Sequence, residues 1–268
     1  MGQKLSRKYI PLLIFTFAFL SLLTGCSTDG EARSTEHYKS LSNSSDHGGA
    51  PPPESKEESA ESPNQEVPES PEEIVVLVHG LGRTEASLLA MQVYLQQEGF
   101  EVFNWGYSSV CCTLEEISRS FADELEEIIA AEPDFIHFVG HSMGNIIIRW
   151  YLHHHLPQQR MGRVVMLAPP NQGSHTADRY VEWFDWAIPP LEDLQTEHSL
   201  AISLPSIDGY EAGVIAGEYD GKVEVEETKG IGERDHRVVS AAHTFIMNRP
   251  DVLQLTVEFL RTGSFGED

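Results

Sequence analysis

The residues of this chain that are best suited to do chemistry are Gly140-His141-Ser142-Met143-Gly144. An apolar run, 135–139, precedes them, and a helix-like stretch, 145–155, follows them. A sharp turn between a strand and a helix lifts its serine above the sheet edge, where a histidine can take the hydroxyl proton. The two glycines have a steric reason, because a Cβ at either position would crowd the flanking strand and helix. The pattern in this context predicts that Ser142 is a nucleophile.

A serine nucleophile needs a general base, and our candidate is His243. It stands between a strand-like segment, 236–241, and the last helix-like segment, which is the loop position that a catalytic histidine requires. The chain has 12 histidines, so most of them have other roles. His236 is the alternative base, although it lies at the start of the strand-like segment.

The base in turn needs an acid that orients it and stabilises the imidazolium ion. Asp220 follows a strand-like segment, 213–217, and is our candidate. Glu218 in the same loop and Asp235, nearer to His243 in the sequence, are the alternatives. An Asp-Gly pair also forms ordinary turns, so a purely structural role for Asp220 stays open.

Strand-like and helix-like segments alternate around these residues from Ile74 onward. The expected strands are 74–78, 101–105, 135–139, 163–168, 213–217 and 236–241. The expected helices are 84–97, 113–131, 145–155 and 250–261, the first two with Thr84 and Thr113 as N-caps. This alternation predicts an α/β fold with a mostly parallel six-stranded sheet and helices on both of its faces.

The segment 169–210 interrupts the alternation, and a loop of about forty residues inside a domain is usually functional. It contains Trp183, Phe184 and Trp186. Because it follows the strand after the serine helix, we expect a cap over the sheet edge that carries Ser142. Its apolar side either lines a pocket for an acyl chain or packs the cap onto the body of the domain, and both roles stay open.

Five pieces of the chain, in their order, resemble α/β-hydrolases of the lipase and esterase type. They are His79-Gly80-Leu81-Gly82, Gly140-His141-Ser142-Met143-Gly144, Ala168-Pro169-Pro170-Asn171-Gln172-Gly173-Ser174, Gly217-Glu218-Tyr219-Asp220-Gly221-Lys222-Val223, and His243 before a final helix. The chain order of serine, acid and histidine is the order of this fold. The resemblance spans about 74–260 and implies a carboxylic ester hydrolase that needs no cofactor.

The resemblance also implies an oxyanion hole formed by the backbone N–H groups of Leu81 and Met143. His79 and His141 are then residues that shape the site without acting as the base. Larger members of the fold begin with an extra hairpin, which this chain lacks before Ile74, so we expect the minimal sheet of small bacterial lipases. We expect no metal site, although the acidic loop 224–227 leaves a calcium site open.

The N-terminal part of the chain is expected to lie outside the folded domain, 74–268. Basic residues precede an apolar run, 9–23, which is typical of a signal peptide over 1–25. Leu23-Thr24-Gly25-Cys26 resembles a bacterial lipobox, which implies lipidation of Cys26; an ordinary signal peptide is the alternative. The segment 26–73 is rich in Ser, Pro and Glu and predicts a disordered tether. We therefore expect an exported lipoprotein that is anchored to a membrane of the cell envelope.

The net charge and the cysteines of the chain restrict its possible binding partners. The formal net charge of −24 argues against a nucleic-acid partner. Cys111 and Cys112 are adjacent, and because a disulfide between neighbours is strained and uncommon, two thiols or one bond to another molecule are both possible, and the sequence does not decide their redox state. The sequence does not decide the oligomeric state.

Together these features predict a serine hydrolase that cleaves carboxylic, lipid-like esters through an acyl-enzyme. Acyl transfer to an envelope lipid by the same residues is one alternative. A hydrolase fold that binds a partner without catalysis is the other.

Overall fold

The computed structural model describes residues 73–155, 161–184 and 187–266, and for 182–184 it describes the backbone alone. The predicted signal peptide, Cys26, the tether up to residue 72, and Trp186 lie outside the described residues. Among the described residues, no helix is long and apolar enough to cross a membrane.

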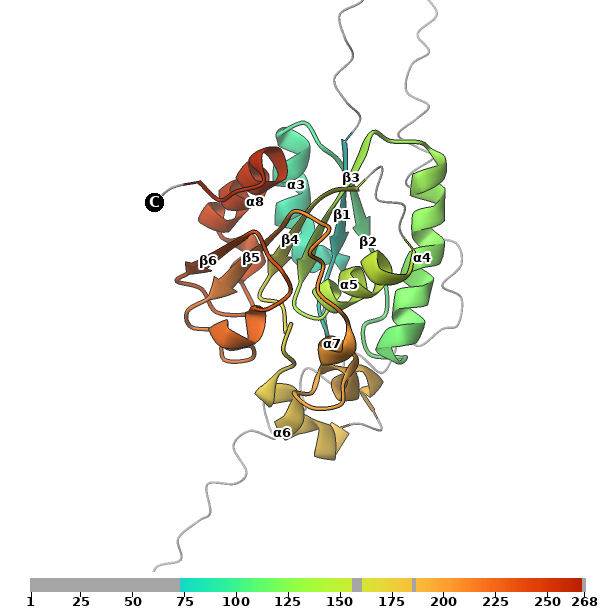
Figure 1. The fold of residues 1–268 in the computed structure, drawn as a ribbon, viewed down its shortest axis with the longest axis vertical. Coiled ribbons are helices and arrows are strands. Elements are labelled where there is room, and N and C mark those ends of the chain that lie inside the picture. Colours follow the sequence, from blue (N-terminus) through green and yellow to red (C-terminus); the bar gives the residue numbers. More distant parts are fainter. Residues whose placement is uncertain (1–72, 156–160, 185–186, 267–268) are drawn as a thin grey trace, which may run out of the picture. The chain divides into compact units, whose positions relative to one another are not determined.

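The core of the fold is a parallel sheet of six strands (Figure 1). The strands are β1 Glu73–Val78, β2 Glu101–Trp105, β3 Phe135–His141, β4 Met161–Leu167, β5 Ala212–Gly217 and β6 Asp235–Val239. Their order across the sheet is β2-β1-β3-β4-β5-β6, and every neighbouring pair is parallel. The predicted six-stranded α/β fold is confirmed, and each predicted strand lies within two residues of an observed one.

Strand β1 shows why a continuous apolar run predicts a strand in the middle of such a sheet. Val76 and Val78 point into the core on one face of the sheet. Val75 and Leu77 point into the core on the other face. Because successive side chains alternate between faces, a strand that is covered on both sides needs apolar residues at every position.

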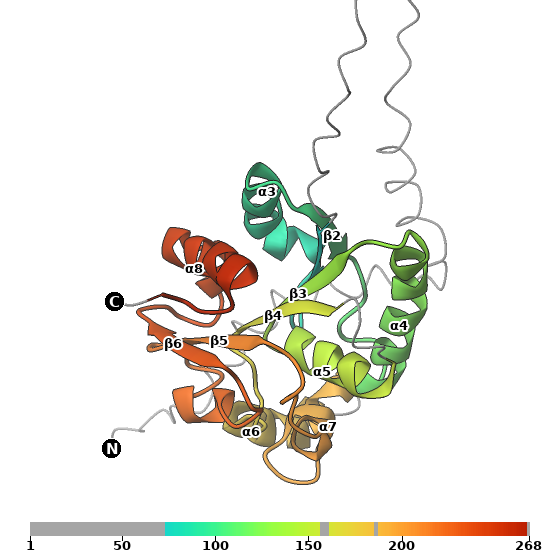
Figure 2. The ribbon, with the colours of Figure 1, turned by 45° about the horizontal axis from the view of Figure 1, so that its top comes forward.

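Helices cover both faces of the sheet (Figure 2). α3 Leu89–Gln97 and α8 Pro250–Thr262 lie on one face, and α4 Leu114–Ala130 and α5 Gly144–His154 lie on the other. All four helices were expected, and their bounds agree with the prediction except at the start of the first. There the chain forms a short 3₁₀ helix, η2 Glu85–Leu88, before α3 begins.

The two predicted N-caps have different outcomes. The Thr113 hydroxyl accepts a hydrogen bond from the Glu116 N–H, and the Glu116 carboxylate accepts one from the Thr113 N–H, so the capping box of α4 is confirmed. The Thr84 side chain caps nothing, and that prediction is wrong. The reason is local, because a tight 3₁₀ turn rather than an α-helical turn follows Thr84.

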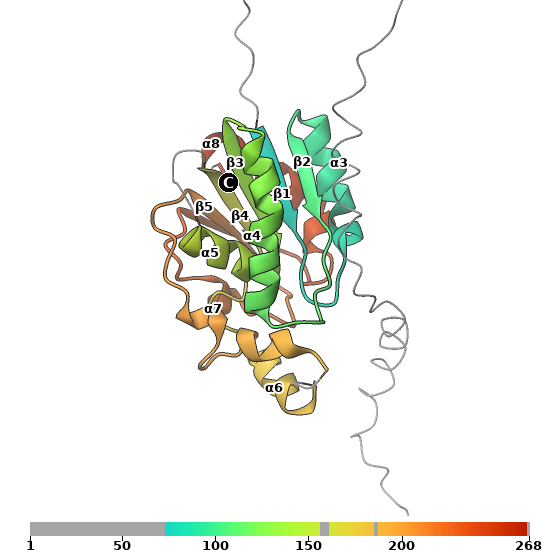
Figure 3. The ribbon, with the colours of Figure 1, turned by 90° about the vertical axis from the view of Figure 1, so that its right-hand side faces the viewer.

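The segment 169–210 contains α6 His175–Phe184, the 3₁₀ helix η4 Pro189–Leu194 and α7 Leu200–Ser203. It lies beyond the end of the sheet, next to α5 (Figure 3). Its buried apolar side chains join the same core as those of α4 and α5; they include Leu191, Leu194, Ala201 and Leu204. These side chains fasten the segment to the body, which is one of the two roles left open by the sequence.

Candidate active site

Ser142 lies in the tight turn between β3 and α5, at the edge of the sheet where the strands end. Its φ angle is 53°, in the left-handed region that non-glycine residues rarely adopt, so the turn is strained. The two glycines of the pentapeptide make this turn sterically feasible. A Cβ on Gly140 would overlap the Asn145 side chain, and a Cβ on Gly144 would overlap the carbonyl oxygen of Val78.

His243 lies between Ser142 and Asp220 and bonds to both. Its Nδ1 is 2.7 Å from Asp220 Oδ2, and its Nε2 is 3.0 Å from Ser142 Oγ. A carboxylate can only accept, so Nδ1 carries the proton and Nε2 is free to accept the serine proton. The structure thus brings together the three residues that the sequence singled out, in the tautomer that a general base requires.

The Asp220 carboxylate is fixed by its own loop and shielded from water. Its Oδ1 accepts hydrogen bonds from the N–H groups of Lys222, at 2.8 Å, and Val223, at 2.9 Å. Its side chain is only 1% exposed. The Asp-Gly turn and the contact with His243 therefore exist together, because the two carboxylate oxygens serve different partners.

The residues that the sequence left as alternatives for the acid and the base form hydrogen bonds with other partners. Glu218 accepts a hydrogen bond from the Ser240 hydroxyl, and Asp235 accepts one from the Phe265 N–H at 2.7 Å. The His236 ring bonds to the Thr228 hydroxyl at 2.8 Å.

Two backbone N–H groups are free to receive a negative oxygen next to Ser142. In the described part of the chain, neither Leu81 nor Met143 uses its N–H in a hydrogen bond. Met143 directly follows the serine at the start of α5. The Leu81 loop lies close to the serine as well, because a Cβ on Gly80 would come within 2.9 Å of the Ser142 Cβ. Both N–H groups therefore remain candidates for the predicted oxyanion hole.

Comparison with solved structures agrees with this arrangement. The structure is similar to the mature form of the Bacillus licheniformis lipase BlEst2, with a TM-score of 0.56, 17% identity, and coverage of 74% of this chain and 94% of the lipase. It is also similar to a hydrolase from Pseudomonas aeruginosa PA01, with a TM-score of 0.51, 17% identity, and coverage of 71% and 90%. The chain has the α/β-hydrolase fold.

A third similar structure is an extracellular α/β-hydrolase from a Paenibacillus species, with a TM-score of 0.50, 14% identity, and coverage of 73% of this chain and 99% of that one. The family model described as "Putative serine esterase (DUF676)" matches residues 68–171, which include Leu81 and Ser142 and end before Asp220. A search of curated proteins finds no match. The predicted resemblance to α/β-hydrolases is confirmed, and the matches support serine hydrolase chemistry.

His141 contacts the backbone of the candidate base. Its Nε2 lies 3.0 Å from the carbonyl oxygen of His243, so the ring donates its proton to the backbone of the base. Burial lowers the pKa of His141 well below its usual value, and the charge of His243 adds to this effect. His141 therefore stays neutral and holds the loop of His243 in place.

The loop after β2 supports the loop that contains Leu81, and the sequence did not reveal this role. The Tyr107 hydroxyl donates to the carbonyl of His79 at 2.6 Å, and the two rings stack with centroids 4.0 Å apart. The Ser109 hydroxyl accepts from the Gly82 N–H at 3.0 Å. Only the fold brings these residues together, because they lie 27 to 28 positions apart in the chain.

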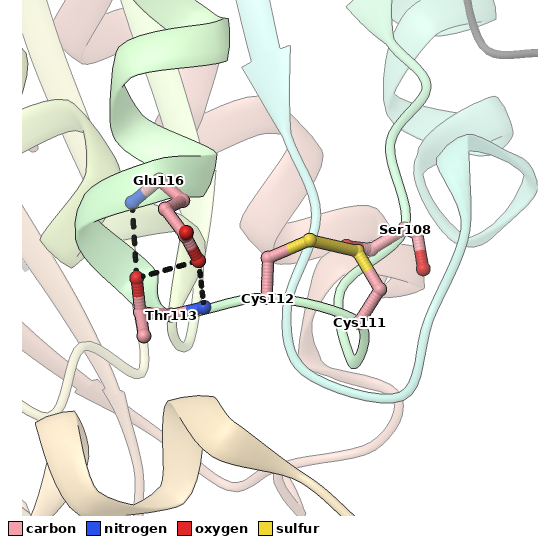
Figure 4. Close-up of a disulfide and its surroundings, with 5 residues drawn as sticks. All are labelled: Ser108, Cys111, Cys112, Thr113 and Glu116. Atoms are coloured by element: carbon pink, nitrogen blue, oxygen red, sulfur yellow. Dashed lines mark hydrogen bonds between the residues drawn. A yellow bond between two sulfur atoms is a disulfide. The ribbon is translucent and has the colours of Figure 1, made fainter. Parts of the chain in front are cut away.

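The same loop ends in a disulfide between Cys111 and Cys112, just before the N-cap Thr113 (Figure 4). The sequence left the redox state of these two cysteines open, and in this structure they are bonded to one another. The segment bends at the two cysteines, and their sulfur atoms meet on one side of it.

Arg149 connects helix α5, which follows Ser142, to the segment 169–210. Its buried guanidinium donates to the carbonyl oxygens of Ala201, at 3.0 Å, and Leu204, at 2.9 Å. Burial lowers its pKa to about 10, so it remains charged at neutral pH. The sequence offered one signal for this role, a single basic residue among the apolar residues of a helix.

The predicted substrate pocket stays a prediction. Trp183 and Phe184 lie at the end of α6, and the structure describes only their backbone. Trp186 lies outside the described residues. The start of this segment is fixed to the acid loop, because the Ser174 hydroxyl donates to the Lys222 carbonyl at 2.7 Å. Among the described residues, no group of three or more His, Cys, Asp or Glu side chains could hold a metal ion.

Proposed function

We propose that this chain is a serine hydrolase that cleaves carboxylic esters through an acyl-enzyme, with Ser142, His243 and Asp220 as its catalytic triad. The observation that carries the proposal is the position of His243, with Ser142 Oγ at 3.0 Å from one ring nitrogen and Asp220 Oδ2 at 2.7 Å from the other. A merely structural histidine has no need for a serine in a strained turn as its second partner.

The first half of the reaction forms the acyl-enzyme. Ser142 Oγ attacks the ester carbonyl as its proton passes to His243 Nε2, and Asp220 stabilises the resulting imidazolium. The N–H groups of Leu81 and Met143 hold the carbonyl oxygen while it carries negative charge. The tetrahedral intermediate then collapses, and the alcohol leaves with the proton that His243 holds.

The second half returns the enzyme to its starting state. Water gives a proton to His243 Nε2 and attacks the acyl carbon. The same two N–H groups hold the second tetrahedral intermediate. Collapse then breaks the bond to Ser142 Oγ, which recovers its proton from His243, and the carboxylic acid is released.

The proposed substrates are lipid-like acyl esters at the cell envelope. The lipobox-like sequence at Cys26 supports a lipid anchor, and the long tether would let the domain work at some distance from the bilayer. The similar Bacillus licheniformis protein is described as a lipase. Acyl chain length and position would be decided by the segment 169–210, which adjoins the acid loop.

A fluorophosphonate probe tests the assignment of the nucleophile. It should label the wild-type protein on the peptide that contains Ser142, and the label should be absent from Ser142→Ala. Ser174, whose hydroxyl bonds to the acid loop, provides the matched control, and Ser174→Ala should still be labelled. Labelling that persists in Ser142→Ala would refute the assignment.

A further inference from the structure

Two basic residues lie in the loops that carry Leu81 and Asp220 in an otherwise acidic chain. The chain carries 42 acidic residues and 18 basic ones. Arg83 lies in the loop after β1, two residues beyond Leu81, and Lys222 lies in the loop after β5, two residues beyond Asp220. In the sheet, β1 is on one side of β3, which leads into Ser142, and β5 is on the other. The two charges therefore approach the serine from opposite sides.

Neither side chain has an acidic partner within the part of the chain that the structure describes. The Arg83 guanidinium and the Lys222 ammonium form no ion pair or hydrogen bond with any described residue, and only backbone atoms of the two residues are hydrogen-bonded. Other basic side chains do pair with acids: Arg119 with Glu115, Arg163 and Arg234 with Glu211, Lys229 with Glu226, Arg249 with Asp251, and Arg261 with Glu98. In so acidic a chain, two cations without partners beside the serine are available for a ligand.

The charges of Arg83 and Lys222 affect pKa values in the candidate site and next to it. Burial and the charge of His243 lower the pKa of His141, and Arg83 and Lys222 lower it further. The pKa of Lys222 is itself lowered, first by desolvation of its ammonium group and then by the charge of Arg83. The residue as a whole is nevertheless exposed. An anion between the two cations would relieve their repulsion and accept charge-assisted hydrogen bonds from both.

We propose that Arg83 and Lys222 form an anion-binding pair that selects esters with a negatively charged group, a carboxylate or a phosphate, close to the scissile bond. The proposal rests on the proposed function and names its substrate class. The charge of Asp220 acts in the opposite direction on the pKa of Lys222, but its buried carboxylate forms no ion pair with Lys222 and bonds instead to His243 and to the backbone of its own loop. A guanidinium and an ammonium on separate loops also suit an anion that is presented from solvent.

The test compares pairs of substrates that have the same acyl chain length and differ in net charge. The full-length protein is assayed with p-nitrophenyl pentanoate, which is neutral, and with mono-p-nitrophenyl glutarate, which has the same acyl length and a terminal carboxylate. A second arm compares monomeric dihexanoyl phosphatidic acid with dihexanoyl phosphatidylcholine. The readout is the ratio of kcat/KM for the anionic and the neutral member of each pair.

Wild-type protein should favour the anionic member in at least one arm, and this preference should weaken as salt rises. The ratio should fall about tenfold in Arg83→Gln or Lys222→Gln, and further in the double variant. The control, Arg119→Gln, removes one surface charge from α4 and should leave the ratio unchanged. The arm that responds distinguishes a soluble carboxylate from a phosphate headgroup.

An unchanged ratio in the double variant, or an equal loss in Arg119→Gln, would overturn this proposal. Failure of the proposed function has a different signature, because pentanoate turnover would then not depend on Ser142. Turnover that depends on Ser142 with no charge preference would reject the anion site alone.

Discussion

At the scale of single residues, the site depends on hydrogen bonds that fix the orientation of each side chain by giving each polar atom its own partner. The Asp220 carboxylate accepts from His243 with one oxygen and from its own backbone with the other. His243 in turn has its backbone carbonyl fixed by His141 and its Nδ1 proton fixed by Asp220. Nε2 is therefore directed at Ser142 without further rearrangement, which is the preorganisation that base catalysis needs.

Replacing Asp220 by Asn should lower kcat about 10³- to 10⁴-fold, because an amide neither stabilises the imidazolium nor holds the required tautomer of His243. Glu218→Gln is the matched control from the same loop, and it should change kcat by no more than about twofold, since its carboxylate bonds to Ser240. Steady-state ester hydrolysis measures both. Equal losses in the two variants would show that Asp220 is not the orienting acid.

The sequence predicted the serine, the base and the acid because each has a local signal, which is a strained turn or a loop directly after a strand. It did not predict Tyr107, Ser109 or Arg149. Their partners lie in segments that are distant in the chain, so no local pattern identifies these contacts, although an arginine among apolar helix residues was a signal that Arg149 has a buried role.

At the scale of elements, helix α4 begins with a capping box and the first helical stretch does not. Thr113→Ala should lower the free energy of unfolding by about 1 kcal/mol, because it leaves the Glu116 N–H without its partner. Thr84→Ala should lower it by less than about 0.3 kcal/mol, since that side chain caps nothing. Urea denaturation of the two variants checks this difference. A similar loss in both would contradict the assignment of the cap.

The segment 169–210 is held to α5 by a buried guanidinium rather than by apolar contacts alone. Arg149→Met keeps the volume of the side chain and leaves several carbonyl groups without a donor, so the free energy of unfolding should fall by about 2–4 kcal/mol. Arg149→Lys should give a smaller loss, because it keeps the charge with fewer donors. The exposed Arg119→Met provides the control, with a loss of about 0.5 kcal/mol or less. Full stability of Arg149→Met would refute this role.

The alternation of strands and helices was predictable because central strands such as β1, β3 and β5 are buried on both faces, and helices such as α4 and α8 bury one apolar stripe. The sequence-based predictions failed or stayed open where local backbone geometry or tertiary packing determines the structure. A 3₁₀ turn replaced the expected first turn after Thr84. The sequence of 169–210 could not decide between a pocket and packing, and the structure assigns its described apolar residues, such as Leu191 and Leu194, to packing.

At the scale of the whole molecule, stability should fall as pH falls through the range in which unfolded histidines take up protons. Burial lowers the pKa of His137 from 6.5 to about 4, with a contribution from the charge of Arg163. The unfolded chain then binds a proton below pH 6.5 that the folded chain binds only near pH 4, so protonation favours unfolding in this window. A difference of this size corresponds to about 3 kcal/mol.

The slope of unfolding free energy against pH tests this effect. Between pH 6.5 and pH 4, His137→Asn should lose less stability than the wild-type protein, because Asn cannot titrate and can still accept the hydrogen bond of the Arg163 N–H. The exposed His153→Asn should behave like the wild type. A wild-type slope in His137→Asn would show that other groups cause the acid sensitivity.

The central claim is that Ser142 carries out ester cleavage, and turnover of p-nitrophenyl esters of increasing acyl length tests it most directly. The wild-type protein should hydrolyse at least one ester in this panel with a kcat at least about 10³-fold above that of Ser142→Ala. The melting temperatures of the two proteins should be similar, which separates lost chemistry from lost folding. Turnover in the wild type that is no faster than in a folded Ser142→Ala protein would contradict the account and leave a hydrolase fold without catalysis.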